Sequence, residues 1–305
     1  MKVQNAVEEY SYAILRHSKA TQHWYIQKLT KFAEWCEQQQ LELEKIKQAD
    51  IRRFLEEMRK RKNQKGTPIS SYTEHSYAQV IKGFLSWCSK EDGIDIFVSD
   101  RLFKHIEMPK VQTKVIETFS KDQIKAILLA CSKEYNDTLT VRDKAIIYVL
   151  FDTGIRAGEL CGLTLDCVEV RPDDVYIRVL GKGDKWREVG LGREARIALH
   201  RYISRYRRAD KEEQHVFLSR LRKPLTVSGL DRLIYRLGRW AHIKGVCCSP
   251  HTFRHTFAVN FLQCTGDIYK LSRLMGHSSV EVTEVYLKAV KSKDVRHSVS
   301  FADTL

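Results

Sequence analysis

The sequence predicts a mainly α-helical chain of two domains, the second of which also carries a small antiparallel sheet. Apolar residues recur at helical spacing through most of its length, and two short runs on either side of Gly181 alternate with strand period. Residues 108–119 contain a proline and two lysines and lack a helical period, which is typical of a linker. With 305 residues, 43% of them hydrophobic, each domain can bury its own core.

The first domain is expected over residues 1–107 as a small helical bundle. Three apolar stripes at spacings of three and four residues predict three of its helices. Ser71 and Glu74 have the spacing of a capping box and are predicted to begin the third helix. The stripes consist of Tyr25, Leu29, Phe32 and Cys36; of Ile51, Phe54, Leu55 and Met58; and of Tyr77, Ile81, Phe84 and Cys88.

A turn between the second and third of these helices is strongly basic. It ends at Gly66 and could face a phosphate backbone, but a solvated charged loop explains the same residues equally well. The basic residues are Arg59, Lys60, Arg61, Lys62 and Lys65.

The second domain is expected over residues 120–305. Ser120 and Gln123 predict the start of a helix, and another helix from about Val141 is predicted to stop at Thr153 and Gly154. Residues 175–179 and 186–189 are predicted as strands, because they alternate around the glycine-rich segment that follows Leu180.

Two more amphipathic helices follow the predicted hairpin. Residues 201–240 hold eleven basic residues against four acidic ones. The helical stripes are Leu199, Ile203 and Tyr206, and then Leu230, Leu233, Ile234, Leu237 and Ala241.

The net charge of +14 points to a polyanionic partner, and to nucleic acid before an anionic membrane. No run approaches the ~18 consecutive apolar residues of a membrane span, and the N-terminus lacks the apolar region of a signal peptide. We therefore expect a cytoplasmic protein. The eight cysteines form no CxxC pair, so we interpret them as buried thiols rather than as a metal site.

The densest candidate site lies near the end of the chain. On a helix that begins near Pro250, His251, Arg254 and His255 would share one face. Alone, this pattern more often marks a surface pair or a core histidine. Its weight grows when it is combined with the turn at residues 153–160 and the hairpin glycines at 181 and 183.

Together these segments resemble the tyrosine recombinases of the phage integrase superfamily, in their simple Xer-like form. The TGIRAGEL turn matches the first family box and puts its arginine at Arg156, and the GKG hairpin puts its lysine at Lys182. The HTFRH box falls on His251, Arg254 and His255. The MGH box ends at His277, and Tyr286 follows nine residues later. The departures, at Gly158, Cys161, Cys167 and Met275, avoid the catalytic positions.

The resemblance implies a helical core-binding domain of SAM-like type and an α+β catalytic domain. It also implies a site-specific recombinase that cuts and rejoins DNA through a 3′-phosphotyrosyl intermediate and a Holliday junction, without a metal or another cofactor. Two alternatives are DNA relaxation of the type IB topoisomerase kind and a DNA-binding accessory protein that has lost catalysis. The protein is expected in the cytoplasm of bacteria or archaea, in association with the nucleoid.

Partners implied by the resemblance are double-stranded recombination sites and three further copies of the chain. In the family, a C-terminal segment docks on a neighbouring protomer and links four subunits in a ring. Val290, Val295, Val299 and Phe301 give this chain a short apolar tail after Tyr286. The alternative is a tail that packs on its own domain or frays.

Each matched residue carries an implied role. Arg156 and Arg254 would clamp the scissile phosphate, because guanidinium forks bind phosphate bidentately at any working pH. Tyr286 would be the nucleophile and Lys182 the general acid for the leaving 5′-oxygen.

The histidines complete the implied set. His251 would serve as the base near the tyrosine, His277 would bond the phosphate or hold the tyrosine loop, and His255 is expected to be structural. Plainer interpretations are a salt bridge of Arg156 with Glu159, a turn lysine at Lys182 and a core aromatic at Tyr286.

Overall fold

The computed structural model describes residues 1–61, 66–111, 116–170, 175–181, 184–208, 210, 212–277 and 279–290. The chain forms two compact units, Met1–Lys114 and Val115–Leu305. The division between them falls inside the segment for which the sequence predicts a linker. The fold class is confirmed: each unit is mainly helical, and the second contains a three-stranded sheet.

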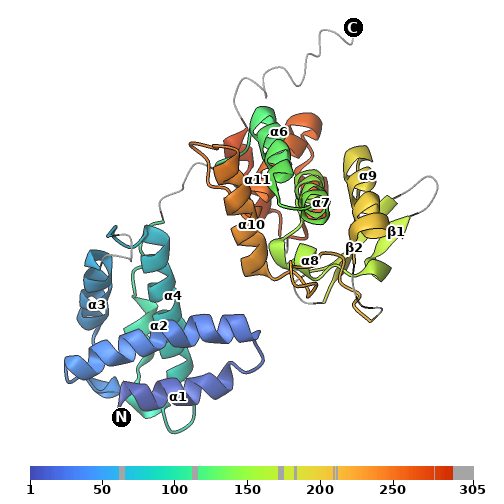
Figure 1. Cartoon of the computed structure of the whole chain (residues 1–305). Coiled ribbons are helices and arrows are strands. Elements are labelled where there is room, and N and C mark those ends of the chain that lie inside the picture. Colours follow the sequence, from blue (N-terminus) through green and yellow to red (C-terminus); the bar gives the residue numbers. More distant parts are fainter. Residues whose placement is uncertain are drawn as a thin grey trace, which may run out of the picture. The chain divides into compact units, whose positions relative to one another are not determined.

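In the first unit, five α-helices and two short 3₁₀ helices are formed by the described residues (Figure 1). The α-helices are α1 (Val3–Ala13), α2 (Lys19–Gln38), α3 (Gln48–Lys60), α4 (Ser71–Cys88) and α5 (Asp100–Lys104), and the 3₁₀ helices are η1 (Leu43–Lys45) and η2 (Asp95–Phe97). The three predicted stripes supply buried residues of α2, α3 and α4. At their centre the Phe54 ring lies 5.1 Å from Phe32 and 5.8 Å from Tyr77, measured between centroids, in edge-to-face contact.

The start of α4 differs from the prediction by one residue. Ser70, not Ser71, is the N-cap: its backbone is extended, and its side chain accepts a hydrogen bond from the Thr73 amide at 3.2 Å. Glu74 instead receives two hydrogen bonds from Arg59, at 2.9 and 3.1 Å. One charge of the predicted basic turn is therefore used within the unit, and Lys62 and Lys65 lie outside the described residues.

In the second unit the helices surround α7, which Figure 1 shows between α11 and α9. The helices are α6 (Lys121–Ala130), α7 (Asp137–Thr153), α8 (Ala157–Cys161), α9 (Arg193–Arg201), α10 (Val227–Trp240), α11 (Pro250–Thr265), α12 (Ile268–Met275) and α13 (Glu281–Glu284). Shorter turns of helix are η3 (Cys131–Lys133), η4 (Leu165–Cys167), the π-helical η5 (Tyr202–Tyr206) and η6 (Leu287–Ala289). The capping box predicted at Ser120 and Gln123 is present at the start of α6.

Helix α7 is longer at its start than predicted. The side chain of Asn136 caps it by accepting a hydrogen bond from the Leu139 amide at 2.9 Å, so the helix begins at Asp137 rather than near Val141. It ends, as predicted, at Gly154, which has a φ of 60°. A Cβ at Gly154 would lie 2.4 Å from the ring of Phe257 on α11, so only glycine allows this close packing.

The sheet has the strand order β1–β2–β3 and is antiparallel throughout. Its strands are β1 (Val168–Val170), β2 (Val175–Leu180) and β3 (Trp186–Gly190). The two predicted strands are present, each one residue longer, and β1 was not predicted because three residues are too few to show a period. In the β2–β3 ladder Val179 pairs with Arg187, and Lys182 and Gly183 lie outside the described residues.

The cysteines only partly follow the prediction of buried thiols. Cys36, Cys88, Cys131, Cys161 and Cys167 are buried, but Cys247 and Cys264 are exposed because they lie before α11 and on its outer side. Within the described ranges, we find no group of three or more His, Cys, Asp or Glu side chains arranged to hold a metal. No helix in that part of the chain is both long and apolar enough to cross a bilayer.

Candidate active site

Arg254 lies on α11, which starts at Pro250 behind the N-cap Ser249. The side chain is almost fully buried, with 5% of its surface exposed. Its Nη1 donates to the Gly154 carbonyl and its Nη2 to the Met275 carbonyl, both at 2.7 Å. One guanidinium therefore joins the end of α7 to the end of α12.

Arg156 precedes α8 and contacts the backbone at the end of α12. Its Nη2 donates to the Gly276 carbonyl at 3.0 Å, and its Nη1 donates to Glu159 Oε1 at 3.0 Å. The Arg156 amide donates to the other oxygen of Glu159 at 2.7 Å. The salt bridge of Arg156 with Glu159, which was its plainer interpretation, is thus present together with the hydrogen bond to the Gly276 carbonyl.

A third arginine, Arg187 on β3, completes this arrangement. Its Nε donates to the Leu274 carbonyl at 2.7 Å, so three guanidinium groups bind the consecutive carbonyls of Leu274, Met275 and Gly276. These carbonyls belong to the C-terminal end of α12, where backbone oxygens lack helical partners and the helix dipole is negative. Neither Arg187 nor Glu159 was predicted from the sequence as a site residue. A strand pattern gives no signal for the former, and the latter was considered only as a salt-bridge partner.

His277 follows this helix end directly. Its Nε2 lies 3.0 Å from Arg254 Nη2, and its Nδ1 lies 2.7 Å from the Thr283 hydroxyl oxygen. Because arginine can only donate, the histidine Nε2 accepts, and the proton of the neutral ring is on Nδ1, which donates to Thr283. This pair of bonds ties the loop after α12 to α13.

Tyr286 lies between α13 and η6 and is buried, with 5% of its surface exposed. Its ring packs in a small cluster with residues of α11 and α12 and stacks against His277, with centroids 6.4 Å apart. Its hydroxyl lies 3.2 Å from Nδ1 of His255. The histidine expected to be structural is therefore the one that contacts the candidate nucleophile.

His251 lies one turn earlier on α11 and is exposed. Its ring centroid is 6.5 Å from that of His255. Arg156, Arg254, His277 and Tyr286 are thus gathered at the end of α12, with His251 one helical turn from the contact to the tyrosine. The remaining predicted site residue, Lys182, lies outside the described residues.

The electrostatics of the cluster favour an anion. Burial and the neighbouring Arg156 lower the pKa of Arg254 to about 10, which still leaves it charged at neutral pH. Burial opposes ionisation of Glu159, but hydrogen bonds from Arg187 and Arg156 outweigh it and lower its pKa to about 2. Of the three guanidinium groups, those of Arg156 and Arg187 bind the Glu159 carboxylate, and that of Arg254 does not.

His277, His255 and Tyr286 are neutral at pH 7. Burial and Arg254 lower the pKa of His277 to about 4, and burial also lowers the pKa of His255. Burial raises the pKa of Tyr286, although Arg254 and Arg156 act in the opposite direction. The phenol therefore keeps its proton until a base removes it.

Comparison with known proteins shows which family the chain resembles in sequence. Residues 117–293 match the phage integrase family, and residues 8–72 match the N-terminal SAM-like domain of phage integrases. Tyrosine recombinase XerC of Leptospira interrogans serogroup Icterohaemorrhagiae is 29% identical over 278 residues, which are 91% of this chain and 85% of the relative.

Two solved structures share the fold. The XerH site-specific recombinase bound to palindromic difH substrate has a TM-score of 0.78 at 19% identity, over 97% of this chain and 84% of that one. A lambda integrase tetramer bound to a Holliday junction has a TM-score of 0.70 at 15% identity, over 94% and 77%. Since the family match alone spans more than half of the sequence, the chain belongs to the phage integrase family and is a tyrosine recombinase of the Xer-like form.

Proposed function

We propose that this recombinase cuts and rejoins specific DNA sites through a 3′-phosphotyrosyl intermediate, with Arg156, Arg254 and Tyr286 at its centre. The observation that carries the proposal is the convergence of two guanidinium groups and a tyrosine on one helix end. A phosphodiester gathers charge on its nonbridging oxygens in the transition state, and fixed guanidinium groups stabilise that charge.

The proposed chemical step is a transesterification. The phenolic oxygen of Tyr286 forms a bond to phosphorus while the bond from phosphorus to the 5′-oxygen breaks, which leaves a 3′-phosphotyrosyl ester and a free 5′-hydroxyl. The phenolic proton passes to a base, and the leaving oxygen takes a proton from Lys182. Attack of a 5′-hydroxyl from another strand reverses the step, forms the Holliday junction and needs no external energy source.

The burial of Tyr286 adds a requirement to this proposal. The residue is 5% exposed, and its hydroxyl is hydrogen-bonded to His255. We propose that the segment from α13 to η6 moves to admit the phosphate. We therefore assign the contact to a resting arrangement, in which His255 holds the tyrosine and the exposed His251 waits for the phosphate side.

Exchanging each histidine for asparagine separates these roles. We expect the cleavage rate of His251→Asn to fall by at least ~10²-fold, as is usual when a general base is lost. His255→Asn should lose less than ~10-fold, because it removes a holding contact only. Single-turnover cleavage of a nicked duplex gives both rates, and a reversed ranking would transfer the base to His255.

Lys182 can be tested through the leaving group. We expect Lys182→Ala to cleave an ordinary duplex slowly but to recover on a duplex whose scissile 5′-bridging oxygen is replaced by sulfur, because a thiolate leaves without a proton. The neighbouring Lys185→Ala serves as the matched control and should show no such recovery. Equal impairment of Lys182→Ala on both duplexes would reduce Lys182 to a phosphate contact.

We further propose that the recombinase holds duplex DNA with both units. The first unit, residues 1–107, would act as the core-binding domain and the second, residues 120–305, as the catalytic domain, with the linker at 108–119. The net charge of +14 supports a DNA partner. A cytoplasmic position at the nucleoid follows from that substrate.

For the active assembly we propose four copies on two duplexes, linked by exchange of the C-terminal tail. The lambda integrase that shares the fold is a tetramer on a Holliday junction. The tail from residue 291 onward lies outside the described residues, so the support from this chain is its apolar sequence alone.

A covalent trap on nicked duplexes tests the proposed function. The protein is incubated with a library of nicked duplexes. Cleavage close to the nick releases a short fragment that carries the free 5′-hydroxyl. This fragment diffuses away, so the strand cannot be rejoined and the adduct persists. We expect adducts on one defined sequence and sequencing to recover it. Adducts spread over all sequences would indicate topoisomerase-like relaxation, and binding without adducts would indicate an accessory protein.

A further inference from the structure

Arg187 contacts both Glu159 and the end of α12 through its guanidinium group. The chemical step proposed for the recombinase gives this arginine no role. Its Nη1 and Nη2 donate to the two oxygens of Glu159, each at 2.8 Å, and its Nε donates to the Leu274 carbonyl. The side chain is 13% exposed and that of Glu159 is 5% exposed. All three nitrogen atoms of the guanidinium group are therefore used inside the second unit.

The partner of Arg187 is also the partner of Arg156. Glu159 accepts from the Arg156 amide at 2.7 Å and from its Nη1 at 3.0 Å. A carboxylate that one arginine holds in a bidentate fork cannot rotate, so its remaining lone pairs fix the direction of the second arginine. The position of the Arg156 guanidinium thus depends on the bond between Arg187 and Glu159.

The helix end provides a second link between the two arginines. Arg187 binds the Leu274 carbonyl, and Arg156 binds that of Gly276 two residues later. A Cβ at Gly276 would come within 2.9 Å of Arg187 Nη1, and a Cβ at Gly181 within 3.4 Å of the same atom. Gly181, which follows β2, and Gly276, which follows α12, therefore both lie close to the Arg187 side chain.

We propose that Arg187 is a positioning residue of the recombinase, which acts through Glu159 and the end of α12 to aim Arg156 at the scissile phosphate. The inference rests on the proposed function, because it presupposes that Arg156 binds that phosphate. Arg187 itself touches no reacting atom. Its loss should leave Arg156 charged but misdirected.

A misdirected clamp differs measurably from a weakened fold. The phosphate clamp stabilises negative charge on the nonbridging oxygens, so its contribution disappears when one of those oxygens is replaced by a methyl group. A defect in the clamp is therefore large on a phosphate duplex and small on a methylphosphonate duplex. A general loss of folded protein lowers cleavage of both by the same factor.

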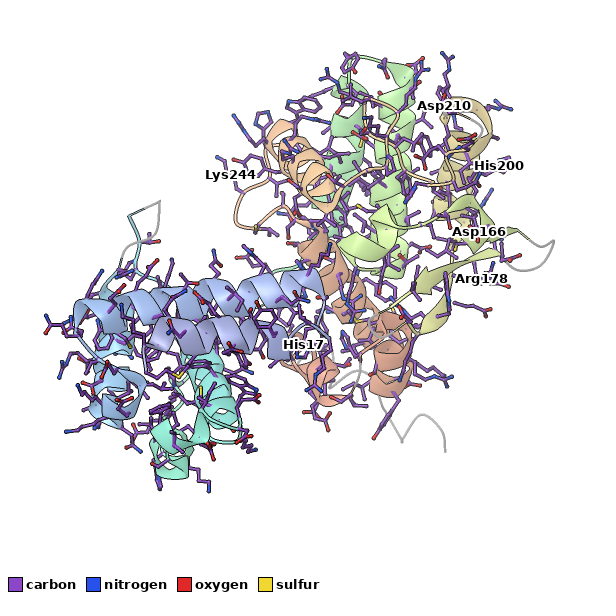
Figure 2. The ribbon with its side chains drawn as sticks, turned by 90° about the horizontal axis from the view of Figure 1, so that it is seen from below. His17, Asp166, Arg178, His200, Asp210 and Lys244 are labelled. Carbon is purple, nitrogen blue, oxygen red and sulfur yellow. The ribbon has the colours of Figure 1, made fainter. Side chains whose placement is uncertain are left out.

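The experiment uses the full chain with Arg187→Gln and Arg187→Lys, and with Arg178→Gln as the matched control. Arg178 is an arginine of the neighbouring strand β2, and its Nη2 donates to the Asp166 carbonyl at 2.7 Å, a pair labelled in Figure 2. It also lies 3.5 Å from Glu169 Oε1. It has the same charge and similar partners, but its contacts are to η4 and β1 and not to the α12 end.

We expect Arg187→Gln to lower cleavage of the phosphate duplex by at least ~10-fold and that of the methylphosphonate duplex by less than ~3-fold. Arg187→Lys should fail in the same way, because an ammonium group cannot form the fork. Arg178→Gln should cleave both duplexes within about twofold of the wild type, as a half-exposed arginine away from the clamp would. Equal losses on both duplexes, or full cleavage by Arg187→Gln, would overturn the proposal.

Two further variants keep the result decisive. If Arg187→Gln does not fold, Glu159→Gln combined with Arg187→Gln removes the unpaired buried carboxylate, and this double variant should show the same substrate dependence. Arg156→Gln is measured beside them on both duplexes. If Arg156→Gln cleaves the phosphate duplex normally, the proposed function fails; if only Arg187→Gln does so, the positioning role alone fails.

Discussion

Tyr286→Phe is expected to abolish the covalent protein–DNA adduct completely. The substitution removes the one oxygen that can bond to phosphorus and leaves the ring, which fills the cluster around Ala258 and Met275. The hydroxyl also contacts His255, so we expect a loss of about 0.5–1.5 kcal/mol in the free energy of unfolding, as for one hydrogen bond. Affinity for the duplex should remain close to that of the wild type.

The adduct is measured by denaturing gel after incubation with the nicked duplex, and affinity by titration of the intact duplex. Tyr269→Phe provides the matched control, because Tyr269 lies on α12 and is 71% exposed. That control should form the adduct at the wild-type rate. An adduct that survives in Tyr286→Phe would assign the nucleophile to another residue.

Arg254→Lys is expected to lower the cleavage rate by at least ~10²-fold, the usual loss when one donor to a transition-state oxyanion is removed. The buried guanidinium reaches the carbonyls of Gly154 and Met275 at the same time, and the single nitrogen of lysine cannot bridge them. One carbonyl is left without its donor, and His277 loses the arginine that faces its Nε2. The charge is kept, but the geometry that directs it is lost.

The same variant should be less stable by about 1–3 kcal/mol, the cost of leaving a buried polar group unpaired. Chemical denaturation measures that loss, and cleavage is compared under conditions where both proteins are folded. Arg239→Lys is the matched control, because Arg239 is exposed on α10. Wild-type cleavage by folded Arg254→Lys would remove this arginine from the proposed clamp.

Local signals in the sequence were sufficient for the helical fold and for the chemistry of the family. Apolar spacing predicted the helices, because a helix buries one face whatever lies against it. Gly154 marked a helix end and Ser120 a helix start through bonds that close within a few residues. The order of the Arg156, Arg254, His277 and Tyr286 motifs predicted the family before any contact was known.

Signals of that kind misplaced residues wherever two patterns competed. Ser70 and Ser71 can both cap a helix, and only the packed chain decides that Glu74 pairs with Arg59 instead of closing a capping box. Residues 168–170 form a strand only because β2 lies beside them, since three residues carry no period of their own.

The contacts at the centre of the site depended on tertiary structure alone. Arg156 reaches Gly276 across 120 positions of the chain, and Arg187 reaches Leu274 across 87. No local pattern reports which carbonyls a distant guanidinium will bind, because the partners meet only after the helices and the sheet have packed. The same packing brings His255, rather than His251, to the hydroxyl of Tyr286. The residue types and their order thus predicted the reaction, and long-range packing determined which side chains support it.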